Sequence, residues 1–212
     1  VLAKTLALLT RSTGEPLFTI DVSFPLSNNN SSPATNLNAA VRYLDFSGRT
    51  WQRCALIGAR PCVGNAALGA EFLRRIDKWI YRRYLSRADM TGLRSQKRRL
   101  YRADLTASVA LDLQATPGAT ADIVAIVQFI QLLNGAAFTN IRVAGTINAI
   151  AALHHNKLLT AEEHNALRDS YLTLKHIQHR LQVITDSSAT ALPQNSKRLQ
   201  HLASSLGYTD DE

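Results

Sequence analysis

Apolar residues at helical spacing constrain the fold of this chain more than any other feature. Between Ala66 and Tyr84 they recur every three or four positions and form one stripe, which predicts an amphipathic helix. The stretch 121–133 is apolar almost all round and predicts a central buried helix. Thr160 and Glu163 form a capping-box pattern at the start of a helical stretch that continues to about residue 185. Shorter helices are predicted from Asn36, over 51–59, 90–105 and 142–153, and over 196–206.

Two segments depart from this pattern. Residues 17–24 alternate and are rich in Phe, Ile, Val and Thr, which predicts a strand. Residues 112–118 predict a short extended piece that ends in a turn. We therefore expect a mostly α protein, with a small strand-containing piece over 1–65 and an antiparallel helical bundle over 66–212. Trp51, Trp79 and Tyr84 are the expected aromatic anchors of its core.

The composition excludes several classes of protein. No stretch reaches the roughly 18 apolar residues that a membrane helix needs, so we expect no membrane partner. Cys54 and Cys62 alone cannot build a disulfide framework or a four-cysteine zinc site, and no acidic residue or cysteine completes a metal set with the histidines. We expect no metal site and a reducing compartment, the cytoplasm. The chain begins with Val1 instead of Met, which indicates processing or excerption and leaves the mitochondrial matrix as the alternative.

Basic residues are concentrated in one window of the chain. The formal net charge is +8, yet the window 74–102 holds eleven basic residues and only two acidic ones, Asp77 and Asp89. Such a density would attract phosphate groups, a nucleic acid or an acidic protein surface. The alternative is a solvated helix face. The candidate phosphate- or nucleic-acid-binding residues are Arg74, Arg75, Lys78, Arg82, Arg83, Arg87, Arg94, Lys97, Arg98, Arg99 and Arg102.

Several short motifs match one family in their order and spacing. They include Phe18-Thr-Ile-Asp21-Val-Ser-Phe24, Gly48-Arg-Thr-Trp51-Gln-Arg53, Tyr81-Arg-Arg-Tyr84 and Asp122-Ile-Val-Ala-Ile-Val-Gln128. Together they resemble the bacterial glutamine synthetase adenylyltransferase, a two-fold repeated enzyme, and the Tyr-Arg-Arg-Tyr element is closer to its N-terminal, deadenylylating repeat. The resemblance covers nearly the whole chain but only the later part of one repeat. It implies that 1–65 is the end of a polymerase-β-like nucleotidyltransferase fold and that 66–212 is the helical bundle that follows.

The resemblance also implies a reaction at a tyrosyl-AMP of glutamine synthetase, with Mg²⁺ and ATP or AMP as the cofactors of the family. Three carboxylates hold the metal ions in the family, and Asp21 matches the third, which makes it the candidate catalytic residue. The other two lie in a Gly-Ser-x-x-Asp-x-Asp element that this sequence does not contain. Because divalent cations need several converging carboxylates, we expect no cofactor for this chain alone.

A second family signature is only partly preserved. The family pattern runs roughly Asp-x-Lys-x-Gly-x-Gly-Gly-Ile-Arg-Asp/Glu-Ile-Glu-Phe, and of its polar and glycine positions Asp112, Gly118 and Asp122 remain as motif remnants. Each replacement removes a charge or a close backbone approach that a phosphate or metal site would use. We interpret Asp112 and Asp122 as turn and cap residues. The replaced positions are Gln114, Thr116, Ala119, Ala121 and Val124.

Three hypotheses about function follow. The first is a catalytically inactive relative of the adenylyltransferase repeat, a pseudoenzyme of nitrogen regulation that serves as a helical scaffold or interaction module with glutamine synthetase as its partner. The second is a basic, RNA-contacting subunit of a ribonucleoprotein or organellar assembly. The third is part of a longer, active adenylyltransferase whose metal-binding Asp pair lies upstream.

Overall fold

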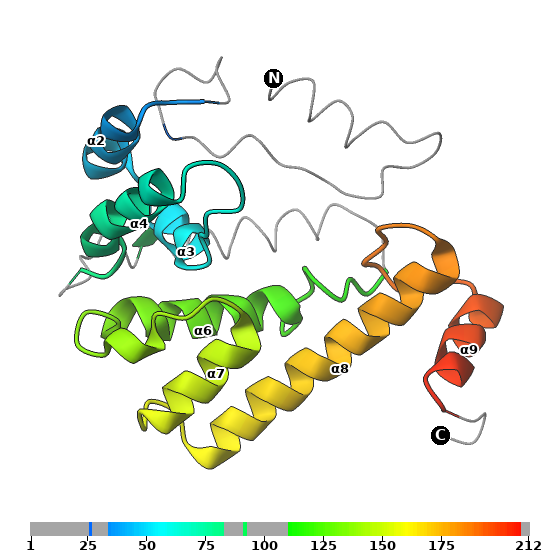
Figure 1. Cartoon of the computed structure of the whole chain (residues 1–212). Helices are drawn as coiled ribbons and strands as arrows, with labels where there is room; N and C mark the ends of the chain where they lie inside the picture. The colour runs from blue at the N-terminus through cyan, green and yellow to red at the C-terminus, as the bar shows by residue number, and fades with distance from the viewer. Residues whose placement is uncertain (1–25, 27–33, 83–90, 93–109, 209–212) are drawn as a thin grey trace. The chain divides into compact units, whose positions relative to one another are not determined.

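The computed structural model describes residue 26 and residues 34–82, 91–92 and 110–208 (Figure 1). These residues are mostly helical, which confirms the predicted fold class. No strand occurs among them, and the one isolated antiparallel bridge there pairs Asp112 with Ala191. The strand predicted at 17–24 and all but two residues of the helix predicted at 90–105 lie outside the described residues. The helices are α2 (Leu37–Ser47), α3 (Thr50–Ile57), α4 (Ala66–Ile80), α6 (Thr120–Asn134), α7 (Thr146–His155), α8 (Ala161–Thr185), α9 (Ser196–Ser205) and the 3₁₀ helix η1 (Thr139–Ile141).

The chain divides into two compact units. One contains residues 1–48 and 61–79, and the other contains residues 49–60 and 80–212. Each unit is defined by contacts between its residues and combines separate stretches of the chain, so the units do not test a division at one point of the sequence. The predicted division into a segment over 1–65 and a helical bundle over 66–212 therefore remains a prediction.

The first unit is described through α2 and nearly all of α4. α2 begins as expected at Asn36, whose Oδ1 accepts a hydrogen bond from the Ala39 amide at 2.8 Å. Trp79 of α4 is buried, as expected, and its ring lies where any side chain at Gly48 would have to go. Glycine is therefore the residue that allows the end of α2 to approach α4 so closely.

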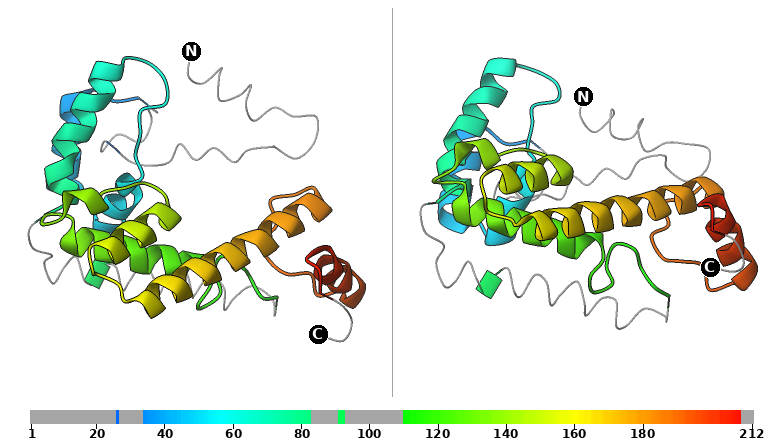
Figure 2. Two further views of the ribbon diagram at one scale, coloured as in Figure 1. Left: turned by 60° about the horizontal axis from the view of Figure 1, so that its bottom comes forward. Right: turned by 90° about the horizontal axis from the view of Figure 1, so that it is seen from below.

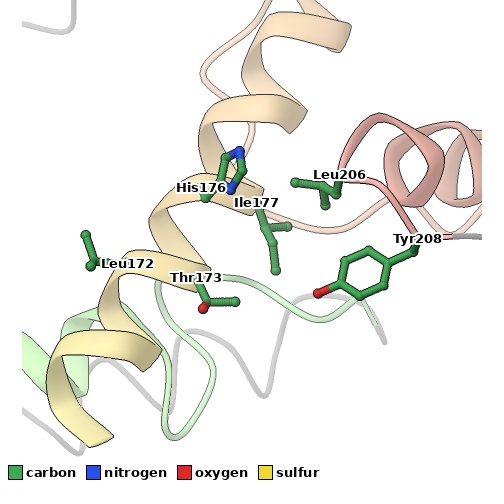
Figure 3. Close-up of a pocket in the computed structure, with 6 residues that line it drawn as sticks. All are labelled: Leu172, Thr173, His176, Ile177, Leu206 and Tyr208. Atoms are coloured by element: carbon green, nitrogen blue, oxygen red, sulfur yellow. The ribbon is translucent and has the colours of Figure 1, made fainter. Parts of the chain in front are cut away.

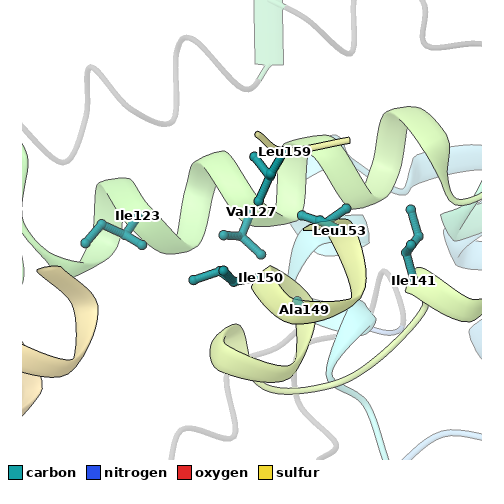
Figure 4. Packing of buried hydrophobic residues seen from close by; sticks show 7 residues of the cluster. All are labelled: Ile123, Val127, Ile141, Ala149, Ile150, Leu153 and Leu159. Carbon is teal, nitrogen blue, oxygen red and sulfur yellow. The ribbon is translucent and has the colours of Figure 1, made fainter. Parts of the chain in front are cut away.

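The second unit is built around α6, α7 and α8, which pack against one another (Figure 2). Apolar side chains of α6 and α7 meet in the core that Figure 4 shows, closed by Ile141 before α7 and Leu159 after it. Their burial supplies most of the favourable free energy of this unit. The cluster consists of Ile123, Val127, Ile141, Ala149, Ile150, Leu153 and Leu159.

The predicted central helix is α6, and it is buried on only part of its surface. Ile126 and Leu133 of this helix are 44% and 43% exposed. The reason is that α3, α7 and α8 pack against α6 but do not surround it. A uniformly apolar sequence predicts a buried helix without showing how many neighbours are available to cover it.

Helix α8 is the longest helix among the described residues, and its start follows the predicted pattern. The Thr160 hydroxyl accepts from the Glu163 amide at 3.2 Å, while the Glu163 carboxylate accepts from the Thr160 amide at 2.8 Å. This reciprocal capping box satisfies two amides that have no partner inside the helix. Farther along, Leu181 of α8 packs with Leu202 of α9 and with Leu113, so that α9 covers the last turns of α8.

Candidate functional site

The segment that carries the motif remnants is a tight loop before α6. The half-buried Asp112 carboxylate accepts hydrogen bonds through Oδ1 from the amides of Gln114 at 2.7 Å and Ala115 at 2.9 Å. Its Oδ2 accepts from the Thr190 hydroxyl at 2.7 Å. Asp122 Oδ2 accepts from the Gly118 amide at 2.9 Å. Both acids therefore act within the loop as capping residues, as the sequence predicts.

The amides at the start of α6 are also occupied. The first four donate to carbonyls of the same loop: Thr120 N to Leu113 O at 3.3 Å, Ala121 N to Gln114 O at 3.1 Å, and the amides of Asp122 and Ile123 to Ala119 O at 3.1 and 3.4 Å. A helix that binds phosphate must present such amides to the ligand. The loop instead folds its own carbonyls over this end of α6.

Replaced positions of the signature take part in the same hydrogen bonds. Thr116, where the family pattern has glycine, accepts from the Asp112 amide through its hydroxyl at 2.9 Å. Close by, the Thr120 hydroxyl donates to Leu113 O at 3.2 Å. Gly118 keeps a φ of +86°, a conformation that favours glycine. The residues that remain and those that have changed thus stabilise one closed loop.

This loop is fastened to the connection between α8 and α9. The Leu113 amide donates to Thr190 O at 2.9 Å, and the Leu192 amide donates to Leu111 O at 2.8 Å. With the Asp112–Thr190 contact, these bonds join segments that lie almost 80 residues apart in the sequence. The extended piece predicted at 112–118 is in fact a series of turns, because its backbone groups bond locally and to this connection.

The environment of Asp112 makes its contribution to stability depend on pH. Burial raises the pKa of this carboxyl, but the hydrogen bonds from Thr190, Ala115 and Gln114 lower it more, so that the net pKa lies below its ordinary value. A group whose pKa is lower in the folded state stabilises the protein above its unfolded pKa, about 3.9 for Asp. That stabilisation is lost as the pH falls through the folded pKa.

We expect Asp112→Ala to lower the free energy of unfolding by about 1–2 kcal/mol at neutral pH, because three donors lose their acceptor. The difference from the unaltered protein should shrink as the pH falls below the unfolded pKa, about 3.9, and on through the lower pKa of the folded carboxyl. Urea unfolding at neutral and acidic pH measures both effects. The control is Asp169→Ala, which removes an exposed carboxylate that contacts Arg168. A loss for Asp112→Ala that does not change with pH would contradict the assigned role.

The described carboxylates do not fit the metal site that the resemblance implies. Asp21 lies outside the described residues, and within the described ranges no group of three or more His, Cys, Asp or Glu side chains could hold a metal ion. Both oxygens of Asp112 and Oδ2 of Asp122 accept hydrogen bonds from protein donors. A Mg²⁺ ion would have to replace those hydrogen bonds, so no metal-dependent step can be derived from these two residues.

The structure describes four of the eleven basic residues of this window: Arg74, Arg75, Lys78 and Arg82. The Glu71 carboxylate bonds Arg74 Nε and Arg75 Nε, each at 2.7 Å, and Arg75 Nη1 also donates to Asn38 Oδ1 at 2.7 Å. Hydrogen bonds from the two arginines lower the pKa of Glu71 to about 2, so it remains ionised. One carboxylate thus offsets part of the positive charge. Phosphate or RNA contact remains a prediction, and the other seven residues of the set, Arg83, Arg87, Arg94, Lys97, Arg98, Arg99 and Arg102, lie outside the described residues.

The Trp51-Gln52-Arg53 segment of α3 belongs to the interior, apart from its tryptophan. Trp51 is 36% exposed, so the prediction that it is buried in the core is wrong. Tyr84, the third predicted anchor, lies outside the described residues. Gln52 is buried and its Oε1 accepts from the Arg49 amide at 2.8 Å. Arg53 is only 1% exposed, and its Nε and Nη2 donate to the Ile80 carbonyl at 3.0 and 2.6 Å. The guanidinium caps the C-terminal end of α4, where helix carbonyls lack partners and positive charge is favoured.

Sequence reasoning assigned no role to two buried polar residues, Arg53 and Gln131. Gln131 Nε2 donates to the carbonyls of Ile141 and Val143 at 2.8 and 3.0 Å and so holds the chain between α6 and α7. The sequence signal for Gln131 was its position as a polar residue inside an otherwise apolar helix, because a buried polar side chain needs a hydrogen-bond partner.

Cys54 follows Arg53 in α3. Burial raises the pKa of the Cys54 thiol to about 11, although the charge of Arg53 lowers it, so this thiol stays neutral at pH 7.

A pocket of about 430 Å³ lies between α8 and the segment after α9 (Figure 3). Polar and apolar side chains share its wall about equally, since three of the lining residues are aliphatic and the other three carry an imidazole or a hydroxyl group. The pocket is lined by Leu172, Thr173, His176, Ile177, Leu206 and Tyr208.

Within the described part of the chain, no helix is long and apolar enough to cross a membrane.

Comparison with known proteins gives two kinds of match. The family model described as GlnD PII-uridylyltransferase matches residues 93–212. Curated relatives from Mesorhizobium japonicum, Xanthomonas campestris pv. campestris and Bradyrhizobium diazoefficiens are 31%, 32% and 28% identical and match 84%, 82% and 92% of this chain. Each of these relatives is named bifunctional glutamine synthetase adenylyltransferase/adenylyl-removing enzyme. The chain spans about a fifth of their length, 18–20%.

Proposed function

The chain belongs to the glutamine synthetase adenylyltransferase family, and from this premise we propose that it is a helical scaffold or interaction module that transfers no adenylyl group by itself. Its partner in this proposal is glutamine synthetase, the protein that the names of its relatives contain. The module would position that partner without supplying reacting groups. The family assignment alone does not separate this role from catalysis, so the proposal depends on the loop before α6.

The closed loop is the observation that carries the proposal. Its two acids and the first amides of α6, the groups with which such a loop could hold a metal ion or a phosphate, are occupied by protein partners. Releasing them would also break the attachment to the connection between α8 and α9. The bond from the Thr120 hydroxyl to the Leu113 carbonyl is buried, and a buried group left without its partner costs about 1–3 kcal/mol, which opposes opening of the loop for a ligand.

An adenylyl-transfer assay tests the absence of chemistry. The purified chain is incubated with glutamine synthetase, Mg²⁺ and radiolabelled ATP, and the reverse reaction is followed as release of label from adenylylated enzyme in the presence of phosphate. We expect no label transfer above background in either direction, whereas the full-length Mesorhizobium relative provides the positive control. Mg²⁺-dependent transfer by this chain would overturn the proposal and favour an active enzyme.

A binding measurement tests the scaffold role separately. We expect the chain to bind immobilised glutamine synthetase and Asp112→Ala to bind as the unaltered chain does, because the carboxylate stabilises the fold and contacts no partner. Calorimetry or surface plasmon resonance gives both dissociation constants. A chain that is folded by circular dichroism and neither binds nor modifies glutamine synthetase would contradict this role.

A further inference from the structure

Two histidines meet beside the turn between α7 and α8 (Figure 1). His154 lies in the last turn of α7 and His164 near the start of α8, and their ring centres are 4.7 Å apart with the ring planes tilted by 34°. The turn itself is tight, because Lys157 adopts a φ of +59° and the Leu158 amide donates to Leu153 O at 3.0 Å. His154 is exposed and His164 is half-buried, so both rings are accessible to a dissolved ion.

Each ring uses the same nitrogen to bond to the protein. His154 Nδ1 lies 3.1 Å from Leu159 O, and His164 Nδ1 lies 3.0 Å from Asn165 Oδ1. Carbonyl oxygens only accept hydrogen bonds, so Nδ1 carries the proton in each ring. The free lone pair of each neutral ring is then on Nε2. Metal-binding histidines typically show this arrangement, in which a hydrogen bond at one nitrogen orients the ring and leaves the other nitrogen for the ion.

We propose that His154 and His164 bind one divalent transition-metal ion, Cu²⁺ or Ni²⁺, through their Nε2 atoms, with water as its remaining ligands. For a metal–nitrogen distance of about 2.1 Å, two rings centred 4.7 Å apart would meet a shared ion at an angle of about 95°. This angle is nearer to the about 90° of the square-planar sites that Cu²⁺ and Ni²⁺ favour than to the about 109° of a tetrahedral zinc site. Within the described ranges no third His, Cys, Asp or Glu completes a metal-binding group with the pair, which also disfavours zinc.

The ion would connect the end of α7 to the start of α8, two helices that pack against each other. Because the two rings come together only when these helices are folded, the ion would stabilise the folded chain. The site differs from the Mg²⁺ site of the family, since Mg²⁺ prefers oxygen ligands. The proposal also goes beyond the proposed function, because the two histidines can hold an ion whether or not the chain binds glutamine synthetase.

Calorimetric titration of the full chain with Ni²⁺ tests the proposal, on protein that carries no polyhistidine tag. Ni²⁺ is the probe because Cu²⁺ would oxidise the exposed thiol of Cys62. We expect saturable binding of one ion per chain that an excess of Mg²⁺ does not displace. Absence of saturable Ni²⁺ binding, or displacement of Ni²⁺ by Mg²⁺, would overturn the proposal.

Two matched asparagine variants locate the ion. His154→Asn keeps an N–H donor near the position of Nδ1 for the Leu159 carbonyl but has no Nε2, and His155→Asn makes the same change at the neighbouring exposed histidine. We expect the first to weaken Ni²⁺ binding by about tenfold or more and the second by less than about twofold. His164→Asn repeats the test at the other ring if His154→Asn does not fold. Equal effects of the His154 and His155 variants would refute this location.

A second pair of histidines on α8 provides a further control. His176 and His179 are exposed and three residues apart, so they lie on one side of the helix. We expect a chain with both His176→Asn and His179→Asn to bind Ni²⁺ within about twofold of the unaltered chain. If this double variant lost the binding and His154→Asn kept it, the assignment to His154 and His164 would be overturned.

Discussion

Replacing Arg53 by alanine is expected to lower the free energy of unfolding by about 3 kcal/mol or more. The side chain fills a fully buried position, and two of its nitrogens donate to the Ile80 carbonyl. Alanine would leave a cavity and a buried carbonyl at the end of α4 without these donors. Urea unfolding followed by circular dichroism measures the loss.

Two further variants separate the causes of that loss. Arg53→Met keeps much of the buried aliphatic stem but provides no hydrogen-bond donor. We therefore expect it to lower the free energy of unfolding, but by less than Arg53→Ala does. Arg180→Ala removes an exposed arginine and should change stability by less than about 0.5 kcal/mol. If Arg53→Met were as stable as the unaltered chain, the hydrogen bonds to Ile80 would contribute nothing measurable.

Truncation of Ile150 to alanine is expected to cost about 2–5 kcal/mol. This side chain of α7 has no exposed surface and lies in the core with Val127 of α6 and Leu153 (Figure 4). Removing its methylene and methyl groups forfeits their burial and leaves a cavity that the packed helices fill only in part. The same urea titration gives the change in the free energy of unfolding.

The control for Ile150 is the same substitution at an exposed isoleucine. Ile126→Ala, on α6, should cost less than about 1 kcal/mol because much of this side chain already contacts water. Ile150→Val, which removes one methyl group, should cost about 0.5–1.5 kcal/mol. Similar losses for Ile150→Ala and Ile126→Ala would show that the observed core does not dominate the stability of this unit.

The capping patterns were the features of the fold that the sequence predicted best. Asn36 caps α2, and Thr160 with Glu163 caps α8, because these interactions join residues only three positions apart. Gly207, with a φ of +91°, follows α9 where the sequence expects that helix to end. The exposure of Trp51 was not predictable in this way, because the amphipathic pattern of an eight-residue helix barely defines its buried face.

The candidate site was predictable where its interactions join residues that are close in the sequence. The motif remnants were identified from their spacing, and the capping roles of Asp112 and Asp122 agree with the local preferences of aspartate. The bond from Thr190 to Asp112 was not predictable, since it joins the loop before α6 to the connection after α8. Nor did the sequence indicate the pocket, whose walls come from α8 and from the residues after α9.

The sequence by itself determined the helical class, the starts of α2 and α8 and the family to which the chain belongs. These properties follow from the order of residues along the chain and from interactions within one or two helical turns. Only the tertiary structure decided that Arg53 caps α4, that α6 is buried on part of its surface and that Asp112 is held by Thr190. The physical reason is that burial and long-range hydrogen bonds depend on which distant segments come together, and local preferences do not specify those partners.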